Sequence, residues 1–310
     1  HKIQYNITPK TAITSYKQIK VYEGDKELTI LDISNMGKEV TSGIIEVEET
    51  LDISKNYRVV IEGYGEKAVV PTAIFDSEYF IENFTYDGND LGAIINGENT
   101  TFKVWAPTAV SVRVNLYESG TEGTDDLIES IEMTAQEQGV WAAAVEGDLN
   151  GTSYTYSVAV GDVVREACDP YARTTGVNGK RAMVIDLDST DPEGWENDCD
   201  PNAGKNITDA IIYELHVRDL SSDPSSGITN RGKFLGVIEE GTHTPDGIPT
   251  GLDHIKSMGI THLHLLPSYD YGSVDEAHPE QPQFNWGYDP VNYNVPEGSY
   301  STDPFHGEVR

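Results

Sequence analysis

Aromatic and acidic side chains that could bind a sugar are concentrated in one short segment, residues 284–290. Trp286 and Tyr288 have flat apolar faces with a polar edge, the combination that stacks on the C–H face of a sugar ring. Asp289 can accept hydrogen bonds from sugar hydroxyls. Tyr288, Trp286 and Asp289 are therefore candidate substrate-binding residues, although an aromatic cluster taken alone is more often structural packing.

Metal-ligating residue types occur without a metal-binding pattern. His262 and His264 alternate along a predicted strand, but no carboxylate or third histidine follows at fixed spacing, so packing is the favoured interpretation. Asp275 and Glu276 could bind calcium, and a surface acidic pair is the commoner alternative. We predict no metal ligand and no required cofactor, with calcium left open.

Several other polar and aromatic residues have a structural interpretation. His216, Arg218 and Asp219 end a predicted strand, where a buried charge network is expected. Trp105 and Trp141 lie within alternating strands, which favours core positions over a glucan-binding platform.

Charge and cysteine content exclude some classes of partner. The chain has 52 acidic and 21 basic residues, a net charge of −31 that repels nucleic acid and anionic membrane surfaces. No apolar run is long enough to span a membrane, and the first residues lack the apolar core of a signal peptide. Cys168 and Cys199 match no zinc or redox spacing, so a disulfide and two inert thiols both remain open, with thiols favoured. We predict an extracellular or cell-surface location, with the cytoplasm as the alternative.

The first two thirds of the chain show the alternation typical of half-buried strands. Residues 1–80 contain such runs at 18–22, 43–48 and 57–62, which predict a small β-sandwich module. Residues 81–190 contain five more, which suit an immunoglobulin-like sandwich: 101–107, 111–117, 140–145, 153–158 and 182–187. Residues 191–208, rich in Asp, Gly, Pro and Asn, read as a linker.

The pattern changes after the linker. Residues 210–217 form a continuous apolar run typical of a buried parallel strand, residues 251–258 have helical spacing, and residues 260–267 predict a second strand. Strand, helix and strand begin a parallel α/β fold. A (β/α)8 barrel needs about 250 residues, so residues 209–310 would hold only its first part.

The order of residues in 284–290 closely resembles the Tyr-Asn-Trp-Gly-Tyr-Asp-Pro motif of type I pullulanases, debranching members of glycoside hydrolase family 13, with Phe284 the one departure. Other segments resemble the same enzymes in the same order: 213–219, 233–236, 250–254, 265–267, 273–276 and 296–301. Upstream, residues 102–107, 169–172 and 177–181 resemble the family 48 carbohydrate-binding module that precedes their barrel. For residues 1–80 the resemblance is weak, although some pullulanases carry an extra starch-binding module there.

The resemblance implies a role for each candidate residue. Tyr288 matches the tyrosine that stacks on the glucosyl unit at subsite −1, beside the scissile bond. Trp286 and Asp289 would shape that loop, with direct sugar contact as the alternative. The hydroxyl of the usual tyrosine is missing at Phe284.

The reaction implied is retaining hydrolysis of α-1,6-glucosidic bonds in pullulan, amylopectin or limit dextrins. An Asp nucleophile and a Glu acid, about 5 to 5.5 Å apart, would perform it. These residues sit on later barrel strands, beyond Arg310, so no catalytic residue is assigned in this chain. The leading hypothesis is the N-terminal portion of a starch-debranching hydrolase that needs the missing C-terminal part of its barrel. The alternatives are a non-catalytic α-glucan-binding protein and a complete enzyme seen only in part, and the full gene sequence would distinguish them.

The first prediction concerns activity. The purified 310-residue chain should release no reducing ends from pullulan, because it has no pair of catalytic carboxylates. A reducing-sugar assay with an intact pullulanase as the positive control measures this, and hydrolysis by the chain would refute it.

Overall fold

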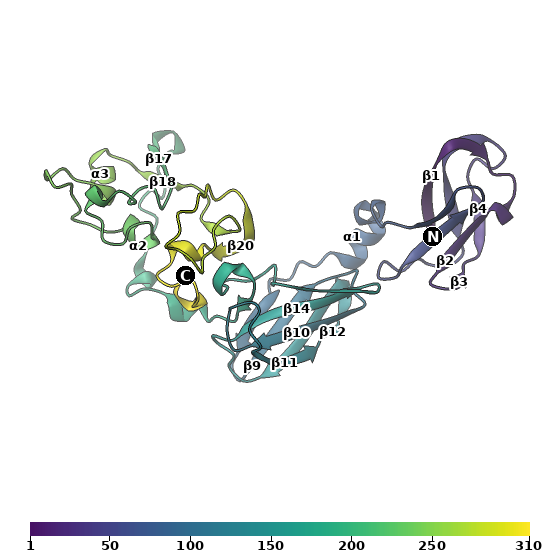
Figure 1. Cartoon of the computed structure of the whole chain (residues 1–310), viewed down its shortest axis with the longest axis horizontal. Helices are drawn as coiled ribbons and strands as arrows, with labels where there is room; N and C mark the ends of the chain where they lie inside the picture. Colours follow the sequence, from purple (N-terminus) through teal and green to yellow (C-terminus); the bar gives the residue numbers. More distant parts are fainter.

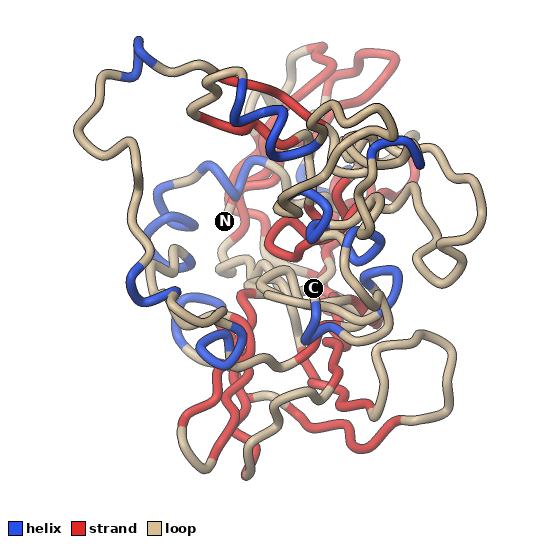
Figure 2. The backbone as a smooth tube through the Cα atoms, turned by 90° about the vertical axis from the view of Figure 1, so that its left-hand side faces the viewer, coloured by secondary structure: helices blue, strands red, loops and turns tan.

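The computed structural model describes residues 1–310 and shows an elongated molecule in which three parts follow one another along the chain (Figure 1). Loops and strands make up most of the backbone, and the helices are short (Figure 2). No helix has the length and apolar character needed to cross a membrane.

The first unit is built by two antiparallel sheets. One has the order β1 (Lys2–Ala12), β5 (Glu39–Val47), β4 (Ile30–Ile33). The other has the order β3 (Lys26–Glu27), β2 (Ile19–Glu23), β6 (Tyr57–Ile61), β7 (Gly65–Ala68). Alternate residues of β1, including Ile3 and Tyr5, are buried in a core shared with β2, β5 and β6, as the period of two in a strand requires. A 3-10 turn, η1 (Tyr16–Gln18), precedes β2.

The second unit also pairs two antiparallel sheets. One has the order β12 (Thr134–Ala135), β13 (Val140–Glu146), β9 (Asn99–Trp105), β8 (Gly92–Asn96). The other has the order β11 (Leu127–Glu132), β10 (Ser111–Tyr117), β14 (Ser153–Val160), β15 (Val163–Ala167), with β16 (Ala182–Met183) pairing β14. The turn η3 (Glu137–Gly139) precedes β13 and η4 (Val177–Gly179) precedes β16. Of the predicted strand 182–187 only Ala182 and Met183 form β16, and the last predicted residue, Leu187, already begins η5 (Leu187–Thr190).

The tryptophans of the second unit have different positions. Trp141 packs against the core of this unit, as predicted. Trp105 is 36% exposed, and its indole N–H donates to the carbonyl oxygens of Phe84 and Gln138. Phe84 ends α1 (Glu78–Phe84), which follows η2 (Ala73–Asp76) between the two units (Figure 1). Trp105 thus holds the connecting helix rather than filling the core.

The C-terminal segment has little regular structure. Two further turns, η6 (Trp195–Asn197) and η7 (Ile207–Asp209), lead to β17 (Ile212–Leu215), which pairs in parallel with β18 (His262–Leu265). Between them lie η8 (Pro224–Ser226), α2 (Phe234–Val237) and α3 (Gly251–Ser257). β19 (Tyr269–Tyr271) pairs antiparallel with β20 (Pro290–Pro296), and the turns η9 (Gly298–Tyr300) and η10 (Gly307–Val309) end the chain.

The expected barrel strands are only partly realised. The strand–helix–strand order is present, but β17 and β18 form a two-stranded sheet and no barrel is evident. The prediction of a buried strand at 210–217 was wrong for its first half, because Ile211 is 51% and Ile212 is 64% exposed. A two-stranded sheet has no further strands to cover these side chains.

Asp169 is an unusual element of the second unit's core. It is 1% exposed, its Oδ2 accepts from the Tyr154 hydroxyl at 2.7 Å, and its Oδ1 accepts from the Tyr171 N–H at 2.8 Å. Burial raises the pKa of Asp169 to about 6, although these hydrogen bonds oppose the shift. An unfolded Asp has a pKa of about 3.9, so the folded state binds this proton more tightly.

The second prediction follows from that difference. The contribution of Asp169 to stability should be complete below pH 4 and be lost as the pH rises through about 6. Relative to Asp169→Asn, whose side chain does not titrate, the parent should lose about 2 to 3 kcal/mol between pH 4 and pH 7. Urea unfolding of both proteins across this range measures the effect, and a pH-independent difference would contradict it.

Candidate functional site

The aromatic residues of the loop 284–290, called here the aromatic loop, face solvent. Phe284 is 79% exposed, and Trp286 and Tyr288 are each 58% exposed. The rings of Trp286 and Tyr288 lie edge to face with centroids 5.5 Å apart. These side chains are outside the core, so the loop presents apolar faces that the chain itself leaves uncovered.

Alternate residues of the same loop are buried and anchor it. Asn285 is 4% exposed, and its Oδ1 accepts from His216 Nε2 at 2.6 Å and from the Tyr300 hydroxyl at 3.2 Å. His216 Nδ1 accepts from the Asp219 N–H at 3.3 Å, which assigns the remaining ring proton to Nε2. The anchor is therefore a neutral hydrogen-bond network between the loop, the end of β17 and η9.

The predicted buried charge network of His216, Arg218 and Asp219 is correct only for burial of His216. The Asp219 side chain is 69% exposed, and Arg218 donates to the carbonyl oxygen of Gln283 at 2.6 Å. The distance between His216 Nδ1 and the Asp219 carboxylate, 3.6 Å, exceeds that of a hydrogen bond. The strand end thus holds the aromatic loop, and its own ion pair, between Arg218 Nε and Asp219 Oδ1 at 3.8 Å, is not buried.

Gly287 occupies the tightest point of the aromatic loop. Its φ is +77°, and a Cβ added there would lie 2.2 Å from the carbonyl oxygen of Pro267. Only glycine allows this backbone to lie against the segment after β18. Asp289, the third candidate, is partly buried, and its Oδ1 accepts from the Ser273 hydroxyl at 3.3 Å.

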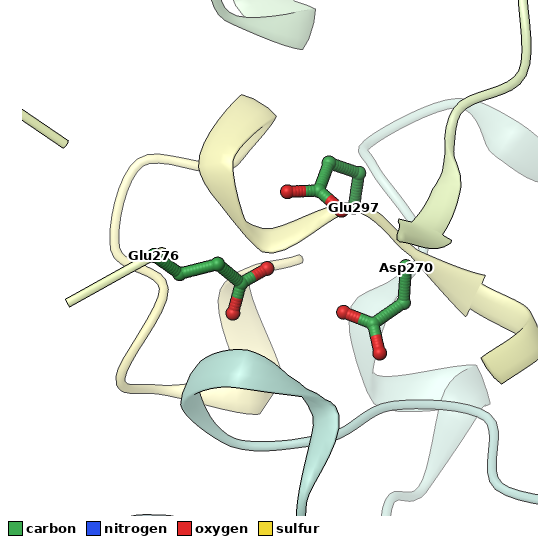
Figure 3. A group of neighbouring side chains, drawn as sticks. All are labelled: Asp270, Glu276 and Glu297. Carbon is green, nitrogen blue, oxygen red and sulfur yellow. The ribbon is translucent and has the colours of Figure 1, made fainter. Parts of the chain in front are cut away.

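A buried carboxylate cluster lies in the same segment, and sequence reasoning missed it. Figure 3 shows the side chains of Asp270, Glu276 and Glu297 converging, with oxygen atoms within 4.8 Å of one another. Arg310 pairs with Asp270 at 2.9 Å and with Glu276 at 2.7 Å. Burial, followed by the charge of Glu276, raises the pKa of Glu297 to about 8.

The surface-pair interpretation of Asp275 and Glu276 was wrong for Glu276, which is 1% exposed. Three carboxylates are the type of ligand that calcium prefers, but calcium takes six to eight oxygens. Here a guanidinium already supplies the positive charge between two of them. The signal in the sequence was the spacing of acidic residues around β19 and β20, which cannot be recognised until the strands pair.

The remaining candidates do not join the aromatic loop. His262 and His264 are exposed rather than packed, with His264 Nδ1 3.1 Å from Glu214 Oε2 and His262 Nδ1 2.8 Å from Thr261 Oγ1. Cys168 and Cys199 are free thiols, and burial raises the pKa of Cys168 to about 12, so this thiol is unreactive at neutral pH.

The second unit has a cavity of about 460 Å³ with a polar lining. The Arg181 guanidinium lies over the Tyr117 ring, 3.6 Å from its centroid, and pairs with Asp126 at 2.8 Å. The Tyr117 hydroxyl donates to Glu166 at 2.5 Å. The aromatic face of Tyr117 is covered in this way, in contrast to the open faces of the aromatic loop.

Comparison with known proteins places the second unit in a defined class. Residues 90–172 match the family described as carbohydrate-binding module 48, the isoamylase N-terminal domain. The chain is thus a modular protein with a carbohydrate-binding module next to the segment that carries the aromatic loop.

The remaining comparisons find that pullulanases are similar to this chain. The chain is 38% identical to the pullulanase of Bacillus subtilis over 78% of its own length and 32% of that protein. It is 54% identical to the crystal structure of the Paenibacillus barengoltzii pullulanase, with a TM-score of 0.72, over 76% of this chain and 36% of that one. The Anoxybacillus sp. LM18-11 pullulanase is 36% identical, with a TM-score of 0.77, and matches 100% of this chain and 43% of that one.

The chain is therefore similar to the N-terminal portion of pullulanases, enzymes of glycoside hydrolase family 13. It spans about a third of the length of the Bacillus subtilis relative.

The third prediction tests how Gly287 shapes the aromatic loop. Gly287→Ala should displace the loop, because the new methyl group meets a backbone oxygen that cannot move freely. Gly247→Ala is the matched control, because Gly247 has a φ of +81° and a Cβ added there would have no atom within 4 Å. This variant should lose only about 1 kcal/mol of stability, from placing alanine in the left-handed backbone conformation. Hydrogen exchange of residues 284–290 should accelerate only in Gly287→Ala. Equal exchange in the two variants would show that the contact with Pro267 does not define the loop.

Proposed function

We propose that this chain is the N-terminal portion of a starch-debranching hydrolase that cleaves α-1,6-glucosidic bonds with retention, and that the aromatic loop forms one wall of its α-glucan site. The observation that carries the proposal is the pair of exposed rings, Trp286 and Tyr288, which contact each other and follow the buried, hydrogen-bonded Asn285. A rigid, exposed aromatic face binds a sugar ring with little loss of conformational entropy.

The relatives support an α-glucan as the ligand. The Paenibacillus barengoltzii pullulanase structure is a complex with maltohexaose and α-cyclodextrin. For this chain we propose pullulan, starch or limit dextrin as the substrate of the whole protein. The net charge of −31 does not oppose a neutral ligand of this kind.

The architecture proposed for the whole protein follows from the same relatives. We propose that β17, α3 and β18 begin a (β/α)8 barrel whose remaining strands supply the catalytic Asp and Glu. The exposed Ile211 and Ile212 suit strands that gain a neighbour in such a barrel. We propose three domains for this chain, residues 1–80, 81–190 and 209–310, with residues 191–208 linking the last two. The extracellular location and the independence from a cofactor stay predictions.

Binding without catalysis is the second candidate function of the chain. It is favoured by the state of the carboxylate cluster, because Asp270 and Glu276 are buried and both pair with Arg310. These two carboxylates are not accessible to a sugar, so they cannot serve as the acid and the nucleophile.

The fourth prediction tests the wall itself. Tyr288→Ala should weaken maltotetraose binding to the chain about threefold to tenfold, the loss expected for one aromatic contact of about 0.5 to 1.5 kcal/mol. Tyr288→Phe should retain binding, because stacking needs the ring and not the hydroxyl. Calorimetric titration gives the affinity, and protection of residues 284–290 from hydrogen exchange locates the sugar.

The control for this experiment is Tyr16→Ala, since Tyr16 is also an exposed tyrosine, at 45%, and lies in the first unit. This variant should leave the protection of residues 284–290 unchanged. If maltotetraose protects the loop equally in the parent and in Tyr288→Ala, Tyr288 is not a sugar-stacking wall.

A further inference from the structure

A turn of the second unit, just after the residues that match the carbohydrate-binding module, reaches the segment that carries the aromatic loop. Asn178, in η4, has a φ of 61°. Its Oδ1 accepts from the Glu276 N–H at 2.7 Å, and its Nδ2 donates to Asp275 Oδ1 at 3.0 Å. Its backbone N–H donates to Glu276 Oε2 at 2.6 Å. Three hydrogen bonds thus join one residue of the second unit to two adjacent residues of the C-terminal segment.

The two contacted residues are themselves held in place. Glu276 pairs with Arg310, and the Gly298 N–H donates to Glu276 Oε1 at 2.8 Å. Arg310 also donates to the carbonyl oxygen of Gly176, two residues before Asn178, at 2.7 Å. Val295 of β20 is fully buried in the core of the second unit. The two parts of the chain therefore share a packed and ion-paired joint.

A second set of hydrogen bonds leads from this joint to the aromatic loop. The Asp275 N–H donates to Gln283 Oε1 at 2.7 Å, and Gln283 Nε2 donates to the carbonyl oxygens of Asp275 and His278 at 3.0 and 3.1 Å. Arg218 donates to the carbonyl oxygen of Gln283. Gln283 immediately precedes Phe284, so the path from Asn178 ends at the first residue of the aromatic loop.

We propose that Asn178 is a positioning residue for the aromatic loop, so that the second unit, which contains the carbohydrate-binding module, contributes to the α-glucan site by holding its sugar-stacking wall. The role in sugar binding rests on the proposed function of that loop. Residues 275–283 have few apolar contacts, since only Val274 beside them belongs to the local core. Their order therefore depends on hydrogen bonds, and those from Asn178 come from a unit whose buried core is larger than that of the C-terminal segment.

The experiment removes the side chain without disturbing its backbone. Asn178→Gly in the 310-residue chain keeps the left-handed conformation and loses the two side-chain hydrogen bonds. Asn35→Gly is the matched control, because Asn35 has a φ of 58° and no side-chain hydrogen bond, and it lies in the first unit. Gln283→Ala breaks the same path one step nearer the loop and leaves the contacts of Asn178 intact.

Two readouts are compared well below the melting temperature. Hydrogen exchange of residues 284–290 should accelerate about threefold to tenfold in Asn178→Gly and in Gln283→Ala, as expected for the loss of one or two hydrogen bonds, and stay at the parent rate in Asn35→Gly. Maltotetraose affinity should fall by a similar factor in the first two variants only. A residue that merely held two folded parts together would lower the melting temperature without changing this affinity.

The outcomes separate this proposal from the function of the loop. Parent exchange rates in the loop of Asn178→Gly would overturn the positioning role, whether or not the chain binds sugar. Faster exchange with unchanged affinity, in an assay where Tyr288→Ala does weaken binding, would also overturn it, leaving only a structural contact. If Tyr288→Ala has no effect on binding, the proposed wall fails, and the exchange rates alone decide whether Asn178 orders the loop.

Discussion

A buried guanidinium determines how the C-terminal segment is held. Removing carboxylates from water is costly unless a positive charge and hydrogen bonds accompany them. Arg310 meets that requirement for Asp270 and Glu276, and it also donates to backbone carbonyls of Pro296 and Gly176. One side chain thereby ties β19, β20 and the turn η4 of the second unit to a common point.

The aromatic loop is held in the same segment by hydrogen bonds. Its exposed rings belong to none of the apolar core clusters, so their positions are set by the buried residues that alternate with them along the chain. Asn285 contacts His216 and Tyr300, and Tyr300 packs edge to face on Tyr271 of β19. The loop is consequently open on the face that carries Trp286 and Tyr288 and constrained through Asn285, the combination that the proposed sugar-stacking surface requires.

The two carbohydrate-related features of the chain also differ in kind. The cavity of the second unit is lined mostly by polar and charged side chains, with the Tyr117 ring covered by Arg181. The aromatic loop offers uncovered rings. In this chain the second unit therefore contributes contact with the C-terminal segment through Asn178 as well as a cavity of its own.

Local patterns in the sequence were sufficient for several strands of the first two units, because a period of two is a property of neighbouring residues. Alternation around Val59 and around Val112 identified strands whose alternate side chains are buried. The motif at 284–290, together with the other matching segments, was sufficient for the resemblance to pullulanases, while the role of Tyr288 stays a prediction. Burial of residues 210–217 could not be read in the same way, since it depends on neighbouring strands that this two-stranded sheet does not have. The carboxylate cluster, the anchoring of Asn285 by His216 and the reach of Asn178 were decided only by tertiary structure. His216 and Asn285 are 69 positions apart and Asn178 and Glu276 are 98 apart, and no local pattern encodes such distances.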